Sequence, residues 1–247
     1  MASGRARVMQ LTDPRKVRIQ HQNKRAWSEV WENNPRIAGP SEEGDFQILY
    51  ARSVSSNMRP YHLAKSPQKW TYNLAFRPDV GELYFSDAEK SFGQQFAPQV
   101  IVEPNIKAAA SPNKRWPWER WQAFASMATK AGIRLYQVGP PGTRKLIGVA
   151  LIDTKSFRLA CAVLARAKAY VGGEGGLHHA AAALGVPGVV VMGGFTPLEL
   201  TGYSLHRNLG VSLGDACGMR MPCAHCAREM ARITPDEVFK QLMEVLK

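Results

Sequence analysis

Cysteines, acidic residues and long apolar runs are all scarce in this sequence. Among its 247 residues are four cysteines, and three of them fall within residues 217–226, which does not resemble the disulfide framework of a small secreted protein. No apolar run is long enough to cross a bilayer, and the first residues lack the apolar segment of a signal peptide. We therefore expect a globular, cytoplasmic protein, with peripheral attachment to the inner membrane surface as a further option.

Acidic residues are outnumbered by basic ones, 20 against 32, which gives a formal net charge of +12. The excess lies mainly after Asn105, where 18 basic residues accompany 9 acidic ones. Such a field favours an anionic partner, for example a nucleotide diphosphate, a phosphorylated glycolipid or a nucleic acid. Charge does not distinguish between these partners, and a basic surface without a specific partner is also compatible with it.

Strand and helix signals alternate regularly in the second part of the chain. The patterns predict strands over 100–102, 133–138, 168–171 and 189–192, and helices over 117–131, 156–167, 177–184 and 235–246. This order is typical of a parallel, doubly wound sheet. Earlier signals are weaker: strands over 8–11, 17–20, 46–50 and 81–85, a helix over 26–31, and a helix over 88–96 capped by Asp87. We place a domain boundary between residues 97 and 98.

Two glycine-rich loops stand out within Val171–Pro197, each at the carboxyl end of a predicted strand. Open α/β sheets bind ligands at such ends. The first loop leads directly into a helix, so its amides and the helix dipole favour an anionic group. A carboxylate would repel phosphate, so we expect Glu174 to accept hydrogen bonds from sugar or ribose hydroxyls, while Gly175, Gly176 and Leu177 supply amides.

A second group of polar residues follows the strand over 100–102. Lys107, Lys114 and Arg115 come just before a predicted helix, where their cations would lie close to a diphosphate. Three tryptophans share this segment, and we expect them to seat the helix on the sheet rather than to bind ligand: Trp116, Trp118 and Trp121.

Together these two segments resemble family nine glycosyltransferases, the heptosyltransferase-like group. The resemblance rests on a lysine and Trp-Pro ahead of a helix, then on an acidic residue, Gly, Leu and His ahead of an Ala-rich helix and a Thr-Pro loop, and it covers residues 98–247. It implies a GT-B-like α/β fold, with a reduced N-terminal α/β domain (1–97) for the acceptor and a parallel doubly wound C-terminal domain (98–247) for the donor.

The resemblance also implies roles for particular residues. Lys114 would neutralise the donor phosphates, Glu174 would stand where the family has an Asp that touches the donor, and His179 matches the family's His. Thr196 lies in a loop that departs from the family's Pro-Thr-Asp-Pro. The implied reaction is inverting transfer of a sugar from a nucleotide diphosphate sugar to a hydroxyl of a saccharide or lipopolysaccharide-type acceptor. No Asp-x-Asp metal motif is present in the sequence, which agrees with transfer without a catalytic metal.

The resemblance does not assign the catalytic base to one residue of this sequence. Family members open with a Gly-Asp loop that supplies it, and here either the chain begins after that loop or another residue serves. By chemical type the candidates are Asp13, His21, Glu29 and His62, of which we retain Asp13 and His62.

Two other functions remain open from the sequence. The basic and aromatic run 52–70, which we interpret as a solvated loop, and the net charge are compatible with a hydroxylated base in DNA as the acceptor. A chain without the base would instead be a non-catalytic module that binds nucleotide sugar or nucleic acid.

A cluster of thiols near the end of the chain offers a possible metal site. Cys217, Cys223, His225 and Cys226 are ligand types that zinc prefers, although the usual paired CxxC is only half present. The cluster is interpreted either as a structural zinc site or as a packed group of reduced thiols.

Overall fold

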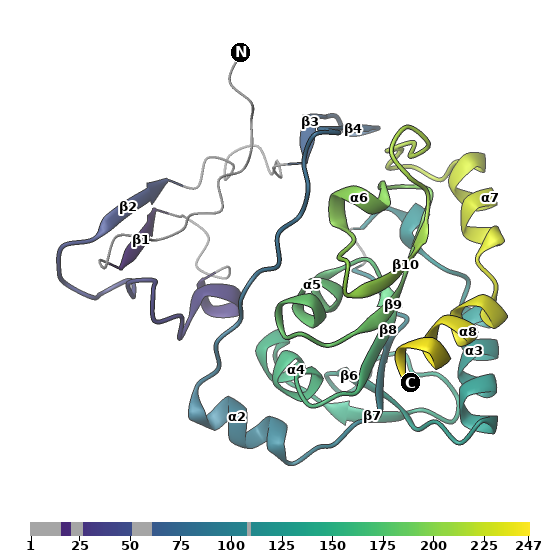
Figure 1. The fold of residues 1–247 in the computed structure, drawn as a ribbon, viewed down its shortest axis with the longest axis horizontal. Helices are drawn as coiled ribbons and strands as arrows, with labels where there is room; N and C mark the ends of the chain where they lie inside the picture. The colour runs from purple at the N-terminus through teal and green to yellow at the C-terminus, as the bar shows by residue number, and fades with distance from the viewer. Residues whose placement is uncertain (1–15, 21–26, 51–60, 108–109) are drawn as a thin grey trace.

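The computed structural model describes residues 16–20, 27–50, 61–107 and 110–247 (Figure 1). The predicted strand over 8–11, two of the base candidates, Asp13 and His21, and residues 52–60 of the basic run lie outside the described residues.

A six-stranded sheet forms the centre of the C-terminal part. Its strands are β5 (Val100–Glu103), β6 (Leu135–Gly139), β7 (Ala150–Asp153), β8 (Ala169–Gly173), β9 (Gly188–Gly193) and β10 (His206–Gly210). All neighbours are parallel, in the order β10-β9-β8-β5-β6-β7. The chain enters at β5, runs outward to β7, returns to β8 beside β5 and runs outward the other way. The predicted doubly wound sheet is confirmed, with its topological switch point between β5 and β8.

Helices cover both faces of this sheet (Figure 1). On one face lie α3 (Trp118–Lys130) and α8 (Pro235–Val245), and on the other lie α4 (Phe157–Leu164) and α5 (Gly176–Ala183). Alternate residues of β5 serve the two faces: Val100 and Val102 pack with α3 and α8, whereas Ile101 packs with α4 and α5. This alternation on fully buried strands explains why they are apolar throughout.

Several short elements depart from the sequence predictions. Residues 81–85 are not a strand, because no described strand lies beside them to complete a ladder. The following helix, α2 (Asp87–Gln94), is capped by Ser86 rather than by Asp87. Ser86 Oγ accepts from the Glu89 amide at 3.2 Å, and the Ser86 amide donates to Glu89 Oε2 at 2.8 Å. Four short elements were not predicted from the sequence: β7, β10, α6 (Leu198–Thr201) and α7 (Ala224–Arg232).

The described residues before residue 98 form small units beside the larger sheet. The strands β1 (Val17–Gln20) and β2 (Gln47–Tyr50) pair in parallel, which confirms two predicted strands, whereas the expected helix over 26–31 is a π-helical turn, η1 (Trp27–Trp31). The run interpreted as a solvated loop contains an antiparallel hairpin, β3 (His62–Lys65) and β4 (Trp70–Tyr72).

The hairpin is anchored on the C-terminal part of the chain. The Trp70 amide donates to the Gly218 carbonyl at 2.9 Å, and the Arg220 amide donates to the Gln68 carbonyl at 2.8 Å. These bonds extend the hairpin by one bridge between Lys69 and Met219. The division at residue 97 remains a prediction, and the chain before it already contacts the chain after it.

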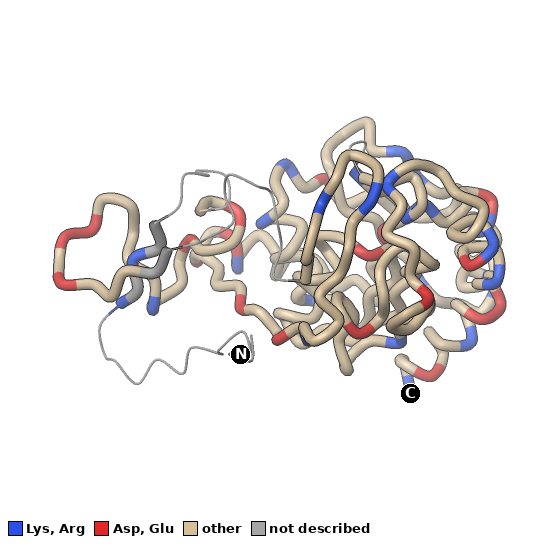
Figure 2. The backbone as a smooth tube through the Cα atoms, turned by 90° about the horizontal axis from the view of Figure 1, so that it is seen from above, with Lys and Arg blue, Asp and Glu red and all other residues tan. Residues whose placement is uncertain are grey.

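Charge is distributed over the surface of this body. Lys and Arg positions recur along the outer loops and helices of the C-terminal part, with Asp and Glu positions between them (Figure 2). Among the helices of the described residues, none combines the length and apolarity needed to span a membrane.

A buried ion pair fastens α2 to α4. The Arg158 side chain is 6% exposed and donates through Nε and Nη2 to the two carboxylate oxygens of Glu89 at 2.5 and 2.8 Å. Arg158 also donates to the Tyr84 carbonyl. Burial by itself would raise the pKa of Glu89, but the hydrogen bond and charge of Arg158 hold it below its usual value.

Replacing Glu89 with Gln is expected to lower the free energy of unfolding by about 3 kcal/mol, because the buried guanidinium loses its counter-charge. Urea denaturation at neutral pH measures the change. Asp87→Asn is the matched control, since the Asp87 side chain is 97% exposed in its pair with Lys90 and should matter far less. Equal losses in the two variants would show that the buried pair does not hold α2 in place.

Candidate functional site

Two loops meet at the switch point of the sheet. The loop after β5 ends in a short 3-10 turn, η2 (Pro112–Lys114), which Ser111 caps by accepting from the Asn113 amide at 3.3 Å. The loop after β8 begins with Glu174, whose amide donates to the Val191 carbonyl of β9 at 3.3 Å. These hydrogen bonds fix the backbone of both loops at the switch point.

The side chains of Lys114 and Glu174 form a hydrogen-bonded ion pair across the switch point. They are 60 residues apart in sequence, and their side chains are only 15% and 7% exposed. Burial by itself would raise the pKa of Glu174, but the Lys114 ammonium and the His179 imidazole hold it well below its usual value. The site therefore keeps a charged carboxylate and a cation side by side in a place that excludes most water.

His179 and Tyr203 extend this pair into a chain of four side chains. The Nε2 of His179 lies 3.6 Å from Glu174 Oε1, and its Nδ1 lies 2.9 Å from the Tyr203 hydroxyl. Tyr203 was not predicted as a site residue, because it follows the second glycine loop and shares no motif with His179. Its hydroxyl fixes the rotation of the imidazole, so that one ring nitrogen faces Glu174.

The neighbouring His178 serves a different purpose. It is fully buried and packs against the rings of His179, Tyr203 and His206, with centroids 4.8 to 5.3 Å apart. Burial lowers the pKa of His178 well below its usual value, and the nearby His179 lowers it further. His178 is thus a neutral packing residue behind the ion pair.

The first turn of α5 follows directly after Glu174. Gly175 is the cap residue, and Gly176 and Leu177 open the helix immediately after Glu174. The first amides of any helix lack partners within it and carry the positive end of its dipole. The three predicted amide donors therefore stand beside the ion pair, in a position suited to an anion.

An aromatic layer closes the site from the side of the hairpin. The Phe195 ring lies 5.4 Å from Lys114 Nζ and 5.1 Å from the Trp70 ring, measured to the ring centroids. The Tyr72 hydroxyl donates to the Phe195 carbonyl at 2.7 Å and lies 3.4 Å from Thr196 Oγ1. Thr196 is 3% exposed, so in this structure it packs against the hairpin. No sequence motif linked these two segments.

Two predicted cations stand outside the buried pair. Lys107 and Arg115 are both exposed, at the two ends of the loop after β5.

The three tryptophans before and within α3 pack as predicted. Trp116 and Trp121 are 4% and 2% exposed, and their rings meet edge to face with centroids 4.7 Å apart. The Trp118 ring lies against the Arg144 guanidinium.

The base candidates lie in different surroundings. His62 is 7% exposed and packs in the hairpin against Trp70 and the neighbouring tyrosines, while Glu29 lies on η1. A further carboxyl, Glu103, ends β5 at the switch point, where burial raises its pKa to about 7. The strand was predicted over 100–102, with Glu103 in the loop that follows; in the structure Glu103 is its last residue, and the burial of its carboxyl depends on the packing around it.

The four predicted metal ligands gather beside the site. Cys217 Sγ lies 3.0 Å from Cys226 Sγ and 3.6 Å from Cys223 Sγ, and the ligand atoms of Cys217, His225 and Cys226 all lie within 4.8 Å of one another. All of these cysteines are free thiols. We refer to Cys217, Cys223, His225 and Cys226 as the thiol cluster.

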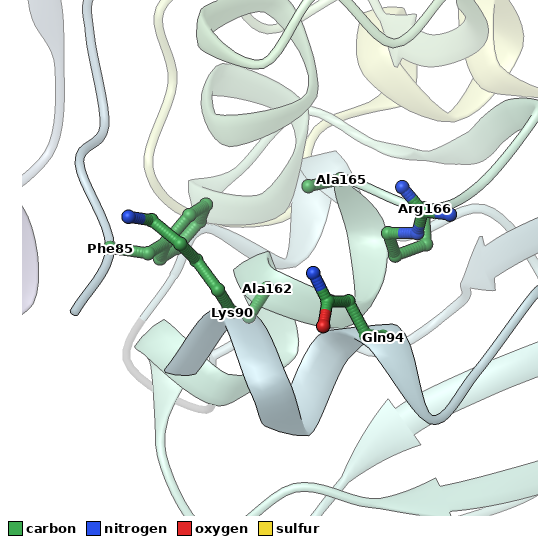
Figure 3. Close-up of a pocket in the computed structure, with 6 residues that line it drawn as sticks. All are labelled: Phe85, Lys90, Gln94, Ala162, Ala165 and Arg166. Atoms are coloured by element: carbon green, nitrogen blue, oxygen red, sulfur yellow. The ribbon is translucent and has the colours of Figure 1, made fainter. Parts of the chain in front are cut away.

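Of two pockets on the surface of the described residues, one lies away from the ion pair and the other lies beside the hairpin. One is formed by α2 and the end of α4, with Phe85, Lys90, Gln94, Ala162, Ala165 and Arg166 around it (Figure 3). It lies toward the amino ends of the strands, away from the ion pair. The other lies between the hairpin and the segment that leads to the thiol cluster, and its lining includes Lys69, Trp70, Pro197 and Cys217.

Replacing Lys114 with Met should leave the Glu174 carboxylate buried without its counter-charge and lower the free energy of unfolding by about 3 kcal/mol near pH 7. Because the pKa of Glu174 is lowered in the folded wild type, the pair stabilises the fold above the pKa of an unfolded Glu, and this stability is lost as pH falls through the folded pKa. Denaturation curves between pH 7 and pH 3 should show the difference shrinking. Lys130→Met, an exposed lysine at the end of α3, is the control. A difference that stays constant with pH would contradict the assignment.

Several solved enzyme structures share the fold of this chain. The E. coli ADP-heptose lps heptosyltransferase II shares 22% identity and a TM-score of 0.51, over 67% of this chain and 53% of that one. A family 9 glycosyl transferase from Veillonella parvula shares 18% identity and a TM-score of 0.50, also over 67% of this chain and 53% of that one. The iron-containing dodecameric glycosyltransferase TibC from enterotoxigenic E. coli shares 13% identity and a TM-score of 0.55, over 94% of this chain and 76% of that one. The chain thus spans about half the length of the first two proteins, and the GT-B-type α/β fold expected from the sequence is confirmed.

Sequence comparison adds the family. A search of curated proteins returned no match. The profile of glycosyltransferase family 9 (heptosyltransferase) matches residues 59–227, from just before the hairpin to the thiol cluster. Since that match covers well over half of the chain and includes both loops of the site, the protein belongs to glycosyltransferase family 9.

Proposed function

We propose that the protein transfers a sugar from a nucleotide diphosphate sugar to a hydroxyl group of a saccharide or lipopolysaccharide-type acceptor, with inversion at the sugar carbon. The observation that carries this proposal is the buried Lys114–Glu174 pair beside the first turn of α5, at the switch point of the sheet. Family membership supports the chemistry, since one similar protein is an ADP-heptose lps heptosyltransferase and TibC has been solved in complex with ADP-D-beta-D-heptose.

Donor binding would exchange the partners of this ion pair. The diphosphate would take the Lys114 ammonium and the amides of Gly175, Gly176 and Leu177, with Lys107 and Arg115 adding positive charge at the entrance. Glu174, released from Lys114, would accept hydrogen bonds from hydroxyls of the ribose or the sugar. His179 is close enough to Glu174 to hold its carboxylate in place during this exchange.

In the proposed transfer, the group that most needs stabilisation is the departing diphosphate. As the bond between the sugar and the diphosphate breaks, negative charge grows on the phosphate oxygens, and a cation with helix amides in a dry site stabilises it without reorganisation. Lys114 and the first turn of α5 supply this stabilisation in our proposal, so transfer needs no catalytic metal ion. Thr196 and the ring of Phe195 would shield the same position from water.

The acceptor would approach along the hairpin. The pocket that includes Lys69 and Trp70 opens beside Phe195, so a basic and aromatic surface leads toward the donor site. Such a surface suits an anionic glycolipid or saccharide, and work at the inner membrane surface would be consistent with it. The base that removes the acceptor proton is proposed among Asp13, His62 and Glu103, the last because a carboxyl with a pKa of about 7 is well matched to that task.

Donor binding gives the direct test. With ADP-sugars and UDP-sugars as probes, calorimetry should detect binding to the wild type, and Lys114→Met and Glu174→Gln should each weaken it by at least tenfold, because each removes a charge-assisted hydrogen bond. Lys130→Met should bind like the wild type. Nucleoside diphosphate release that requires an added acceptor supports a transferase.

Three outcomes would overturn parts of this proposal. Unchanged donor affinity in both site variants means that the donor lies elsewhere. Donor binding without release of nucleoside diphosphate, with any acceptor, indicates a binding module. Salt-sensitive binding of duplex DNA together with sugar transfer to hydroxylated bases assigns the acceptor to DNA.

Replacing Tyr203 with Phe should reduce kcat/KM by about tenfold, because the partly buried hydrogen bond that orients His179 is lost. The unfolding midpoint should change little, since the ring and its packing remain. Tyr136→Phe, on β6 away from the site, is the control. The imidazole nitrogen signals of His179 in NMR spectra should change only in Tyr203→Phe. A variant with wild-type kcat/KM would remove Tyr203 from the site.

A further inference from the structure

The thiol cluster has the geometry of a metal site. In a tetrahedral zinc thiolate, with zinc to sulfur bonds near 2.3 Å, neighbouring sulfurs lie about 3.8 Å apart. The distance from Cys217 Sγ to Cys223 Sγ, 3.6 Å, lies near that value, and the distance to Cys226 Sγ, 3.0 Å, is shorter. Side-chain rotations that move Cys226 Sγ away from Cys217 Sγ would place three sulfurs around one ion. His225 provides a fourth donor within 4.8 Å of Cys217 and Cys226.

Backbone amides are directed at two sulfurs of the thiol cluster. The Met219 amide donates to Cys217 Sγ at 3.4 Å, and the Cys226 amide donates to Cys223 Sγ at 3.4 Å. Cys223 is also the cap residue of α7, so its sulfur lies at the positive end of a helix dipole. Amides directed at sulfur stabilise the negative charge that thiolate ligands carry.

The imidazole of His225 lacks a partner of its own. Its Nδ1 is buried and, within the described part of the chain, has no hydrogen-bond partner. Its ring is held in place by Gly194, where an added side chain would come within 2.9 Å of the imidazole. A buried ring nitrogen without a partner is costly unless a ligand satisfies it, and a metal ion in the thiol cluster would do so.

The segment that carries the cluster is tied to both loops of the donor site. The Cys217 amide donates to the Gly194 carbonyl at 3.1 Å, next to Phe195. From the other side, Asn113 Nδ2 donates to the Met219 and Met221 carbonyls at 2.6 and 2.7 Å, directly before Lys114 in sequence.

The segment thus has few regular backbone bonds of its own but positions the turn that presents Lys114. An ion that cross-links Cys217 to α7 would fix this segment as a disulfide or zinc clip fixes a loop.

We propose that the thiol cluster binds one divalent metal ion, zinc by its ligand set, with Cys217, Cys223, Cys226 and His225 as ligands. The ion is structural, because four protein ligands leave no open position for substrate. It holds the segment between the two donor loops and stands apart from the reacting atoms. The assignment does not depend on the proposed transfer reaction.

The test measures metal in the full-length protein, purified under reducing conditions without a metal-affinity tag. Plasma mass spectrometry should find close to one equivalent of metal, and Cys223→Ser and Cys226→Ser should each lower it severalfold. Cys161→Ala is the matched control, because Cys161 is buried in α4, outside the thiol cluster, and this variant should retain the metal. Cobalt substitution should give the absorption of tetrahedral thiolate coordination, and its loss in Cys223→Ser would locate the ion.

The remaining outcomes are equally informative. Iron bound by the same residues supports the site and corrects the ion. Protein that refolds and melts normally with no bound metal, after exposure to zinc under reducing conditions, overturns the proposal. An intact mass lighter by two hydrogens, with Cys217 and Cys226 joined in peptide maps, would instead identify a disulfide and also overturn it.

Discussion

The buried pair of Lys114 and Glu174 is the interaction on which the site depends. A carboxylate this deep would be protonated or expelled without a cation, and the cation would be equally unfavourable alone. Each therefore requires the other, and the two loops that carry them must stay together. In this structure the pair neutralises itself. Under the proposed function, a diphosphate and a sugar hydroxyl would replace both partners at once, so the two charges would be compensated with and without the ligand.

The contacts around this pair hold its two loops in fixed positions. Asn113 and the thiol cluster segment fix the turn that ends in Lys114, while the β9 carbonyl at Val191 fixes the backbone of Glu174. Tyr203 orients His179 against the same carboxylate. The hairpin adds Trp70 and Tyr72 against Phe195, so a segment from the first third of the chain closes a site built from the rest.

The central sheet could be read from sequence because its signals are local and repeated. Buried strands such as Val189–Met192 are apolar throughout, and helices such as Trp118–Lys130 show one apolar face and a clear start. Where periodicity was short, prediction was wrong or absent. Residues 81–85 have the composition of a strand but no neighbour to pair with, and Ser86 competes with Asp87 as a cap with the better-placed oxygen. The hairpin at 62–72 was mistaken for a solvated loop because its stability comes from bonds to residues 218 and 220.

For the site, the amino-acid sequence by itself determined which chemical groups would be present: a lysine before one helix, a glutamate and glycines before another, and thiols close together near the end. These are properties of neighbouring residues, and the spacing of strand, loop and helix was enough to place them at strand ends. Only the tertiary structure decided that Lys114 and Glu174 would neutralise each other, that Lys107 and Arg115 would stay exposed, and that Tyr203, Phe195 and Tyr72 would enclose the pair. The reason is physical: burial and electrostatic pairing depend on distances through space, and those are set by the order of strands in the sheet rather than by their order in the chain.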